Sequence, residues 1–257
     1  IDGAELGKTV SPIHGLRGDV KKTLQKLLPL LHKVSHPDWQ AQIDEMLVQE
    51  QAGLDSREGM TPRNVITTLN RFLGENTPVA TDVGQHQMWA AQYLNLKTSR
   101  RFLSSGGLGT MGFGMGAAIG AALGCGERSV LVTGDGSFGM NLNELATAVA
   151  NQIPMVILLL DNNVLGMVRQ WQTLFFDKHY SNTNLDARKT DFVKLAEAFG
   201  AEGSRALSIP ELEAALAKAF SWNGPYLIDC AIDRDEFVLP MLPPGGSMDD
   251  IITRIGD

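Results

Sequence analysis

The chain has little of several features that mark specialised classes of protein. Its 257 residues include only two cysteines, Cys125 and Cys230, with no CxxC spacing. A disulfide framework and a cysteine-based zinc site are therefore excluded, and a reducing compartment is expected. There is also no excess of basic charge, since 22 Lys and Arg face 29 Asp and Glu for a net charge of -7. Without a basic stripe, no nucleic-acid partner is expected.

The chain also lacks an apolar run suited to a membrane. The uncharged stretch 104–126 is about as long as a membrane span, but nine of its residues are glycine. No basic segment leads into an apolar run at the start, so no signal peptide is expected. These features predict a cytoplasmic protein without a membrane partner. Because the sequence starts at Ile1 and without Met, we expect a fragment of a longer chain.

The first third of the chain divides at a polar linker. Apolar residues recur at helical spacing behind Asp19, and residues 37–51 form a second amphipathic pattern. The polar stretch 49–59 follows, and Thr61 with Pro62 then supplies an N-cap and a first helical residue for a helix ending near Gly74. We therefore predict two domains, 1–58 and 59–257.

Strand-length apolar runs alternate with helical patterns in the second domain. Uninterrupted runs such as residues 156–160 are typical of strands buried on both faces, which predicts a parallel sheet sandwiched by helices. The fold class is therefore α/β. The expected strands are 79–82, 101–103, 130–133, 155–160, 201–205 and 226–232, and the expected helices 87–94, 112–123, 141–151, 191–199 and 209–220. Ligands bind at the carboxyl ends of such strands, so we expect a site within 81–86, 133–137 and 161–167.

A glycine-rich motif, GxGxxG at residues 107–112, offers a first interpretation. With Asp135 downstream to hold a ribose, it matches a weak dinucleotide fingerprint and a nicotinamide dehydrogenase. Glycines at 112, 116, 120 and 124 also recur every four residues. They predict a bare helix face that a neighbouring backbone or a cofactor can approach closely.

A second motif predicts a metal-diphosphate site. Gly134-Asp135-Gly136-Ser137 directly follows one expected strand, and Asp161-Asn162-Asn163 directly follows the next. Neighbouring parallel strands would bring a carboxylate and an amide oxygen to one edge, where both suit Mg²⁺ shared with phosphate oxygens. The flanking glycines would let the backbone approach the ligand.

Together these segments resemble the acetohydroxyacid synthase (acetolactate synthase) family, catalytic large subunit. Gly134-Asp135-Gly136 with Asn162 matches the thiamin-diphosphate motif, and residues 84–89, 105–112, 143–145 and 166–172 narrow the resemblance, which covers residues 60–257. It implies the thiamin-diphosphate-binding fold, with residues 1–58 as a remnant of the family's central domain plus linker.

The resemblance also implies roles for individual residues. Mg²⁺ would be bound by Asp135, Asn162 and the Val164 carbonyl, and Met111 would support the bent cofactor. Met167 and Trp171 would face the substrate, with Trp171 on a flexible segment, 165–180, although core packing of a helix is the alternative for Trp171. The cofactor-binding set implied is Gly84, Gln85, His86, Gly109, Met111, Gly134, Asp135, Gly136, Ser137, Asn162, Gly166 and Met167. For His86, a place near a helix N-cap without cofactor contact is the alternative.

The activity that the resemblance implies is a carboligation in branched-chain amino acid biosynthesis. Pyruvate would be decarboxylated on thiamin diphosphate and joined to pyruvate or 2-ketobutyrate, in a homodimer with a regulatory small subunit. The family also binds FAD, whose site would be largely absent here. The glutamate that activates the cofactor would come from a partner subunit, so the fragment is expected to bind Mg²⁺ and diphosphate but to be nearly inactive. A nicotinamide dehydrogenase and a noncatalytic α/β scaffold remain the alternatives.

Overall fold

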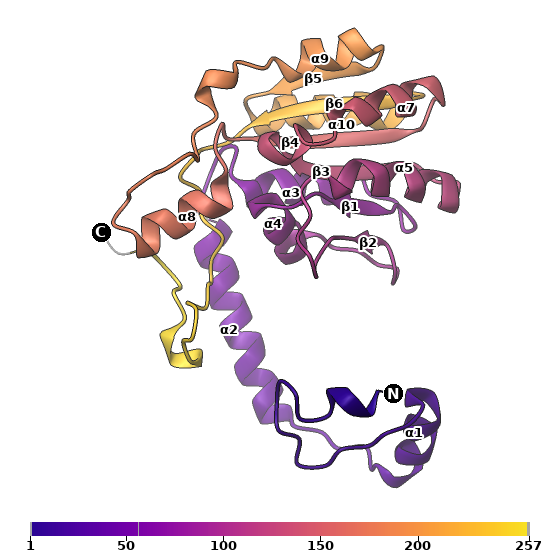
Figure 1. The fold of residues 1–257 in the computed structure, drawn as a ribbon, viewed down its shortest axis with the longest axis vertical. Helices are drawn as coiled ribbons and strands as arrows, with labels where there is room; N and C mark the ends of the chain where they lie inside the picture. Colours follow the sequence, from indigo (N-terminus) through magenta and orange to yellow (C-terminus); the bar gives the residue numbers. More distant parts are fainter. Residues whose placement is uncertain (1, 56, 256–257) are drawn as a thin grey trace. The chain divides into compact units, whose positions relative to one another are not determined.

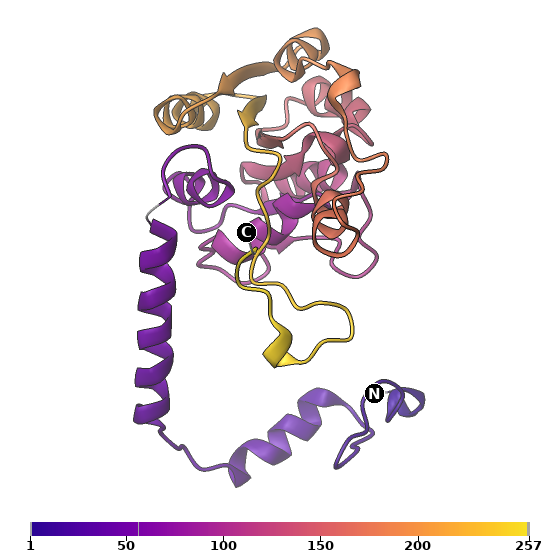
Figure 2. The ribbon, with the colours of Figure 1, turned by 90° about the vertical axis from the view of Figure 1, so that its left-hand side faces the viewer.

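The computed structural model describes residues 2–55 and 57–255 and forms two compact units, Ile1–Ser56 and Arg57–Asp257. In the first unit the short turns η1 (Gly3–Glu5) and η2 (Leu28–Leu30) accompany helices α1 (Val20–Leu27) and α2 (Pro37–Asp55). The Asp19 carboxylate accepts a hydrogen bond from Lys22 N at 2.9 Å and so caps α1 as expected. Residues 49–55, expected as linker, instead continue α2, a single helix in Figure 2. No described side chain in residues 2–49 is buried.

The second unit is built on a six-stranded parallel sheet with the order β2-β1-β3-β4-β6-β5, which confirms the predicted α/β fold (Figure 1). All six expected strands are present within two residues of the expected bounds. They are β1 (Val79–Thr81), β2 (Phe102–Leu103), β3 (Ser129–Gly134), β4 (Met155–Asp161), β5 (Glu202–Ala206) and β6 (Pro225–Ala231).

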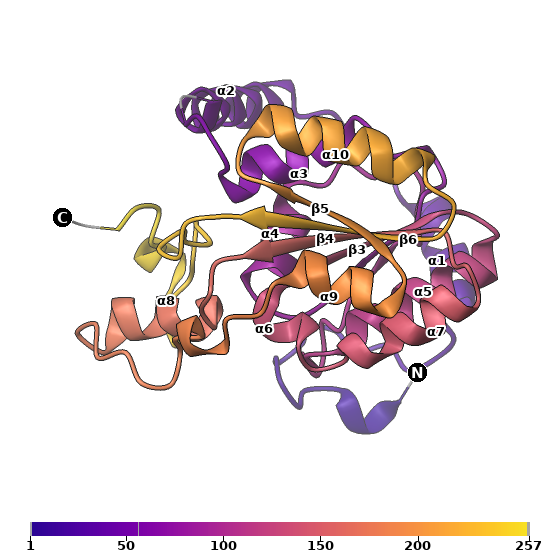
Figure 3. The same ribbon diagram turned by 90° about the horizontal axis from the view of Figure 1, so that it is seen from above.

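Helices cover both faces of this sheet, as Figure 3 shows. On one face lie α3 (Pro62–Asn70), α4 (Gln85–Tyr93) and α10 (Ile209–Ser221), and on the other lie α5 (Phe113–Cys125), α7 (Leu145–Ala150) and α9 (Phe192–Phe199). The expected helix 141–151 is interrupted, because its first turn is the 3-10 helix η3 (Leu142–Glu144). The short helix α6 (Asp135–Phe138) follows β3 directly, and α8 (Gly166–Phe175) follows β4 after a loop. After β6 the chain leaves the sheet (Figure 2) and includes the turn η5 (Met248–Asp250).

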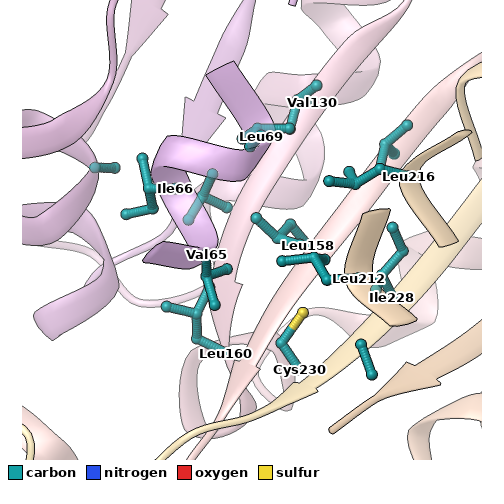
Figure 4. Close-up of a cluster of buried hydrophobic side chains, with 14 of the residues drawn as sticks. Val65, Ile66, Leu69, Val130, Leu158, Leu160, Leu212, Leu216, Ile228 and Cys230 are labelled. Atoms are coloured by element: carbon teal, nitrogen blue, oxygen red, sulfur yellow. The ribbon is translucent and has the colours of Figure 1, made fainter. Parts of the chain in front are cut away.

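Two hydrophobic cores, one on each face, hold these layers together. Figure 4 shows the first, in which Leu69 of α3 and Leu212 of α10 gather with Leu158 of β4. The second packs Met115 and Phe192 against the opposite face of the sheet. Six consecutive residues of β4 are buried because helices cover both faces. No described helix is both long and apolar enough to cross a membrane.

The sequence predicted a close approach along the glycines at 112, 116, 120 and 124, and this prediction is wrong for the last three. Open space lies where a Cβ would project from Gly116, Gly120 or Gly124. The close approach occurs instead at Gly114, where a Cβ would lie 2.6 Å from Leu131 Cδ1 and 2.8 Å from the Asp82 backbone nitrogen. The four-residue spacing marks a solvent-facing stripe because the helix turns a different side towards β3 and β1.

Candidate active site

The loops after β1, β3 and β4 meet at one edge of the sheet and enclose a cavity of about 170 Å³. Since β3 lies between β1 and β4, three adjacent parallel strands deliver their carboxyl ends to this edge. The first turn of α8 closes another side, and Figure 3 shows α8 beyond this end of the sheet. The cavity thus lies where the strand ends were expected to hold a ligand.

Every residue expected to bind the cofactor or the metal lines this cavity. Trp171 is the exception among the expected site residues. The residues brought together are Gly84, Gln85, His86, Gly109, Met111, Gly134, Asp135, Gly136, Ser137, Asn162, Val164, Gly166 and Met167, alongside the apolar side chains of Val83, Trp89, Leu160, Leu165 and Val168.

Asp135 begins α6 directly after β3, and its side chain is only 2% exposed. Arg188 donates to it twice, from Nη2 to Oδ2 at 2.7 Å and from Nη1 to the main-chain oxygen at 2.9 Å. Burial, reinforced by the charge of nearby Asp161, raises the pKa of Asp135 to about 7, and the arginine acts in the opposite direction. The charged form of a carboxylate that is buried this deeply is strongly stabilised by a bound cation.

The loop after β4 supplies the second oxygen group. Asn162 is nearly buried, and its Oδ1 accepts a hydrogen bond from Val164 N at 3.2 Å. Asn163 has a φ of 56°, the left-handed conformation that asparagine tolerates better than most residues. This turn holds the Asn162 side chain and the Val164 backbone within one short loop at the cavity.

His86 lies in the first turn of α4 and is buried. Its ring forms a hydrogen bond with the backbone of Asp82, and its Nε2 has no hydrogen-bond partner. Burial lowers the pKa of His86 to about 3, so the ring is neutral at pH 7. Gly134 makes room for this ring, because a Cβ there would lie 2.7 Å from His86 Nδ1. His86 is thus part of the cavity lining as well as near the helix start.

Gln85 has a similar unsatisfied group. Its Nε2 donates to Gln170 Oε1 and to the Glu236 carbonyl, both at 2.9 Å, while its buried Oε1 has no partner. Gly166 allows this arrangement, since a Cβ there would lie 1.9 Å from that oxygen. Both atoms, Gln85 Oε1 and His86 Nε2, are hydrogen-bond acceptors, because the one N–H of the neutral His86 ring is used at Asp82. Buried polar atoms without partners are costly, so two such acceptors in one cavity lining indicate a ligand that offers hydrogen-bond donors.

The residues present fit a diphosphate with a divalent metal. Asp135 and Asn162 offer hard oxygen atoms on two adjacent loops, and glycines keep the cavity wall free of side chains. No group of three or more His, Cys, Asp or Glu suited to a metal occurs in residues 2–55 and 57–255. The expected ligand set differs from such a group, because only one of its three members is an Asp. The other two are an amide oxygen and a main-chain carbonyl.

Trp171 lies one turn beyond the cavity, on α8. Its side chain is 37% exposed and packs edge-on against Phe175, with ring centroids 5.3 Å apart. Met167 and Val168, on the preceding turn, line the cavity. The segment expected to close over the site, 165–180, is helical over Gly166–Phe175. Trp171 on this helix is neither in the core nor in the cavity wall.

Three residues of this region escaped the sequence analysis. Arg188 belongs to the turn η4 (Asp186–Arg188), and nothing near it in the sequence indicates Asp135 as its partner. Asp82 is 1% exposed, and its Oδ1 accepts from Gly112 N at 2.7 Å, which ties the Met111 loop to β1. Gln170 is buried and pairs with the Val238 backbone. All three depend on contacts between distant segments.

Comparison with known proteins agrees with this geometry. Residues 82–230 match the family described as thiamine pyrophosphate enzyme, C-terminal TPP binding domain. The chain is 39% identical to acetolactate synthase 1, chloroplastic, of Nicotiana tabacum, over 99% of this chain and 40% of that protein. It is 42% identical to a probable acetolactate synthase large subunit of Methanocaldococcus jannaschii, and 41% to the acetolactate synthase isozyme 2 large subunit of Escherichia coli (strain K12). These two matches cover 99% of this chain and 45% and 46% of those proteins.

The chain therefore spans less than half the length of these relatives. Within that span the match includes the loops after β1, β3 and β4. On these grounds the chain belongs to the thiamine pyrophosphate enzymes, whose C-terminal TPP-binding domain it contains, and it is similar along almost its whole length to acetolactate synthase large subunits.

Proposed function

We propose that the cavity binds thiamine diphosphate with Mg²⁺, in a protein that condenses pyruvate with pyruvate or 2-ketobutyrate for branched-chain amino acid biosynthesis. The observation that carries the proposal is the lining itself. It combines a buried carboxylate and amide on adjacent loops with two buried polar atoms that lack partners, Gln85 Oε1 and His86 Nε2. The similarity to acetolactate synthases supports the choice of substrates.

In this proposal the metal is held by the carboxylate of Asp135, the amide oxygen of Asn162 and the main-chain carbonyl of Val164. For Asn162, metal binding requires that Oδ1 give up or share the hydrogen bond that it accepts from Val164 N. Gly84, Gln85, His86, Gly136 and Ser137 lie around the diphosphate, and the remaining glycines of the lining let the backbone approach it. The neutral His86 ring adds no charge, and its Nε2 accepts a hydrogen bond, so it suits a donor group of the cofactor or a metal-bound water.

Bound thiamine diphosphate supplies an electron sink that lets a 2-keto acid lose CO₂. The chain's own residues bind and orient. Met111 offers an apolar, polarisable surface for the bent cofactor, and Met167 and Trp171 shape the substrate side. Leu165 and Val168 form an apolar part of the cavity wall and exclude water from the reacting groups.

The wider assignments belong to the same proposal. They are domains 1–58 and 59–257, a homodimer, a regulatory small subunit, an FAD bound outside this span and a cytoplasmic location, although tobacco relatives are described as chloroplastic. The name "large subunit" of several relatives supports the small-subunit partner. We expect the 257-residue chain by itself to bind metal and diphosphate with negligible acetolactate formation, because the resemblance assigns the activating glutamate to a partner subunit.

Calorimetric titration of the chain with thiamine diphosphate, with and without Mg²⁺, tests the proposal. We expect saturable binding that requires Mg²⁺. Metal-independent binding of NAD would favour a nicotinamide dehydrogenase instead, and no thiamine diphosphate binding at any Mg²⁺ concentration would favour a noncatalytic scaffold.

A further inference from the structure

We propose that Arg188 is a positioning residue that holds the Asp135 carboxylate in place for the metal. The inference rests on the proposed function, because it assumes that Asp135 binds Mg²⁺. It concerns the arginine alone, which reaches Asp135 across 53 positions in the sequence.

The first support is the side from which Arg188 approaches. Asp135 lines the cavity and Arg188 does not. A cation that merely took the place of the metal would lie in the cavity beside Asn162 and Val164. Arg188 instead contacts one carboxylate oxygen and the main-chain oxygen of the same residue, at 2.7 and 2.9 Å. This double contact fixes the side chain of Asp135 relative to its own backbone.

The second support is what holds Arg188. Its guanidinium carbon lies 5.2 Å from the centroid of the buried Phe192 ring. The planar group is therefore oriented by two residues, Asp135 through hydrogen bonds and Phe192 through its ring. The side chain is 29% exposed, whereas that of Asp135 is 2% exposed. Arg188 is thus partly exposed to solvent, whereas the carboxylate that it holds is buried.

The third support is the segment that carries Arg188. Residues 183–185 pair with the loop after β4, through Leu165 N to the Thr183 carbonyl and Leu185 N to the Asn163 carbonyl, each at 2.8 Å. Val164 forms a bridge with Asn184 in the same place. One short segment therefore touches both loops that carry the expected metal ligands, and Arg188 is its contact with the Asp135 side.

Residues that hydrogen-bond to a metal ligand set its orientation, and losing one commonly costs about 10–100-fold in metal affinity. We therefore expect R188Q to weaken Mg²⁺ binding by roughly that factor. R188K should fall between R188Q and the wild type, because an ammonium retains the charge but cannot reproduce the fork or its stacking.

The matched control is R205Q. Arg205 pairs with Asp229, which is also 2% exposed, at 2.9 Å, and neither residue lines the cavity. R205Q removes the same kind of ion pair, here between β5 and β6, and should leave Mg²⁺ binding unchanged. Far-UV circular dichroism and metal-free melting temperatures of all three variants establish that they are folded.

The test titrates wild type and variants with Mg²⁺ at saturating thiamine diphosphate by calorimetry, and with Mn²⁺ followed by its electron paramagnetic resonance signal. Weaker metal binding in R188Q, partial rescue in R188K and no change in R205Q support the proposal. Unchanged or tighter binding in R188Q overturns it, the latter showing that Arg188 competes with the metal. If R188Q does not fold, R188K decides, since metal binding equal to wild type overturns the proposal. A wild-type protein that binds no metal or cofactor contradicts the proposed function instead.

Discussion

Asp135 and Asp229 provide a comparison between two regions of one sheet. Each side chain is 2% exposed and paired with one arginine, at 2.7 Å for Asp135 and 2.9 Å for Asp229. Burial raises the pKa of both carboxyls, and the charge of Asp161 adds to it. Asp229 lies within β6, opposite Arg205 of the adjacent strand β5, away from the cavity. Asp135 lies beyond the end of β3, in the cavity wall.

The difference shows that a buried ion pair does not by itself identify a site. Asp229 is enclosed between strands, where its arginine neutralises a charge that the sheet has buried. Asp135 is flanked by glycines and lies in a lining that contains unpartnered polar atoms. The ligand is therefore indicated by the surroundings of the carboxylate, while its burial and its arginine are common to both regions.

The largest expected effect separates these two aspartates. D135N should weaken Mg²⁺-dependent binding of thiamine diphosphate by more than about 100-fold, the upper end for residues that only contact a metal ligand. D229N should leave that binding unchanged, because Asp229 does not reach the cavity. Calorimetry on folded variants measures both. Equal losses in the two variants would contradict the distinction drawn here.

The next effect concerns protonation on the cavity side. The folded pKa of His86, about 3, lies below its ordinary value of 6.5, so between these values the unfolded chain binds the extra proton. This group's contribution to the free energy of unfolding is therefore present above pH 6.5 and is lost as the pH falls. Between pH 6.5 and 4.5 the loss should be about 2 kcal/mol.

Urea unfolding across this pH range measures the effect. H86Q should show a shallower pH dependence than the wild type, while H179Q, which alters an exposed histidine, should not. A wild-type slope retained in H86Q would assign the acid sensitivity to other groups.

A smaller effect sharpens the contrast between the two sides of α5. G114A would force a methyl group against Leu131 and the Asp82 backbone, and should lower the free energy of unfolding by about 1–3 kcal/mol. G120A enters open space within the same helix and should raise it by about 0.5–1 kcal/mol. Chemical denaturation of both variants decides. Equal destabilisation would mean that helix packing does not distinguish these glycines.

The last expected effect, on product choice and not on total rate, compares two partly exposed tryptophans. In an active full-length protein, W171L should change the ratio of products from pyruvate and 2-ketobutyrate more than the total rate, by about 1–3 kcal/mol in acceptor discrimination. Trp222 has 39% exposure, close to the 37% of Trp171, but follows α10, so W222L should keep the wild-type ratio. An unchanged ratio with a collapsed rate in W171L would assign Trp171 to the chemistry or the fold.

The sequence alone determined most of the fold. Uninterrupted apolar runs such as β4 identify strands that helices cover on both faces, because only such strands avoid water on both sides. Local capping chemistry marked helix starts at Asp19 and Thr61, each of which accepts a hydrogen bond from its own first turn. Polar residues directly after strands then identified the edge where the cavity lies.

Tertiary structure decided the features that depend on contacts between distant segments. Arg188 could not be paired with Asp135 from the sequence, because a charged residue in a polar turn has no local feature that names its partner. The spacing of the α5 glycines could not show which side meets the sheet, a choice that the packing of β1 and β3 made at Gly114. Local periodicity and capping depend on neighbours along the chain, whereas the direction of a side chain in a site depends on which strands the sheet places side by side.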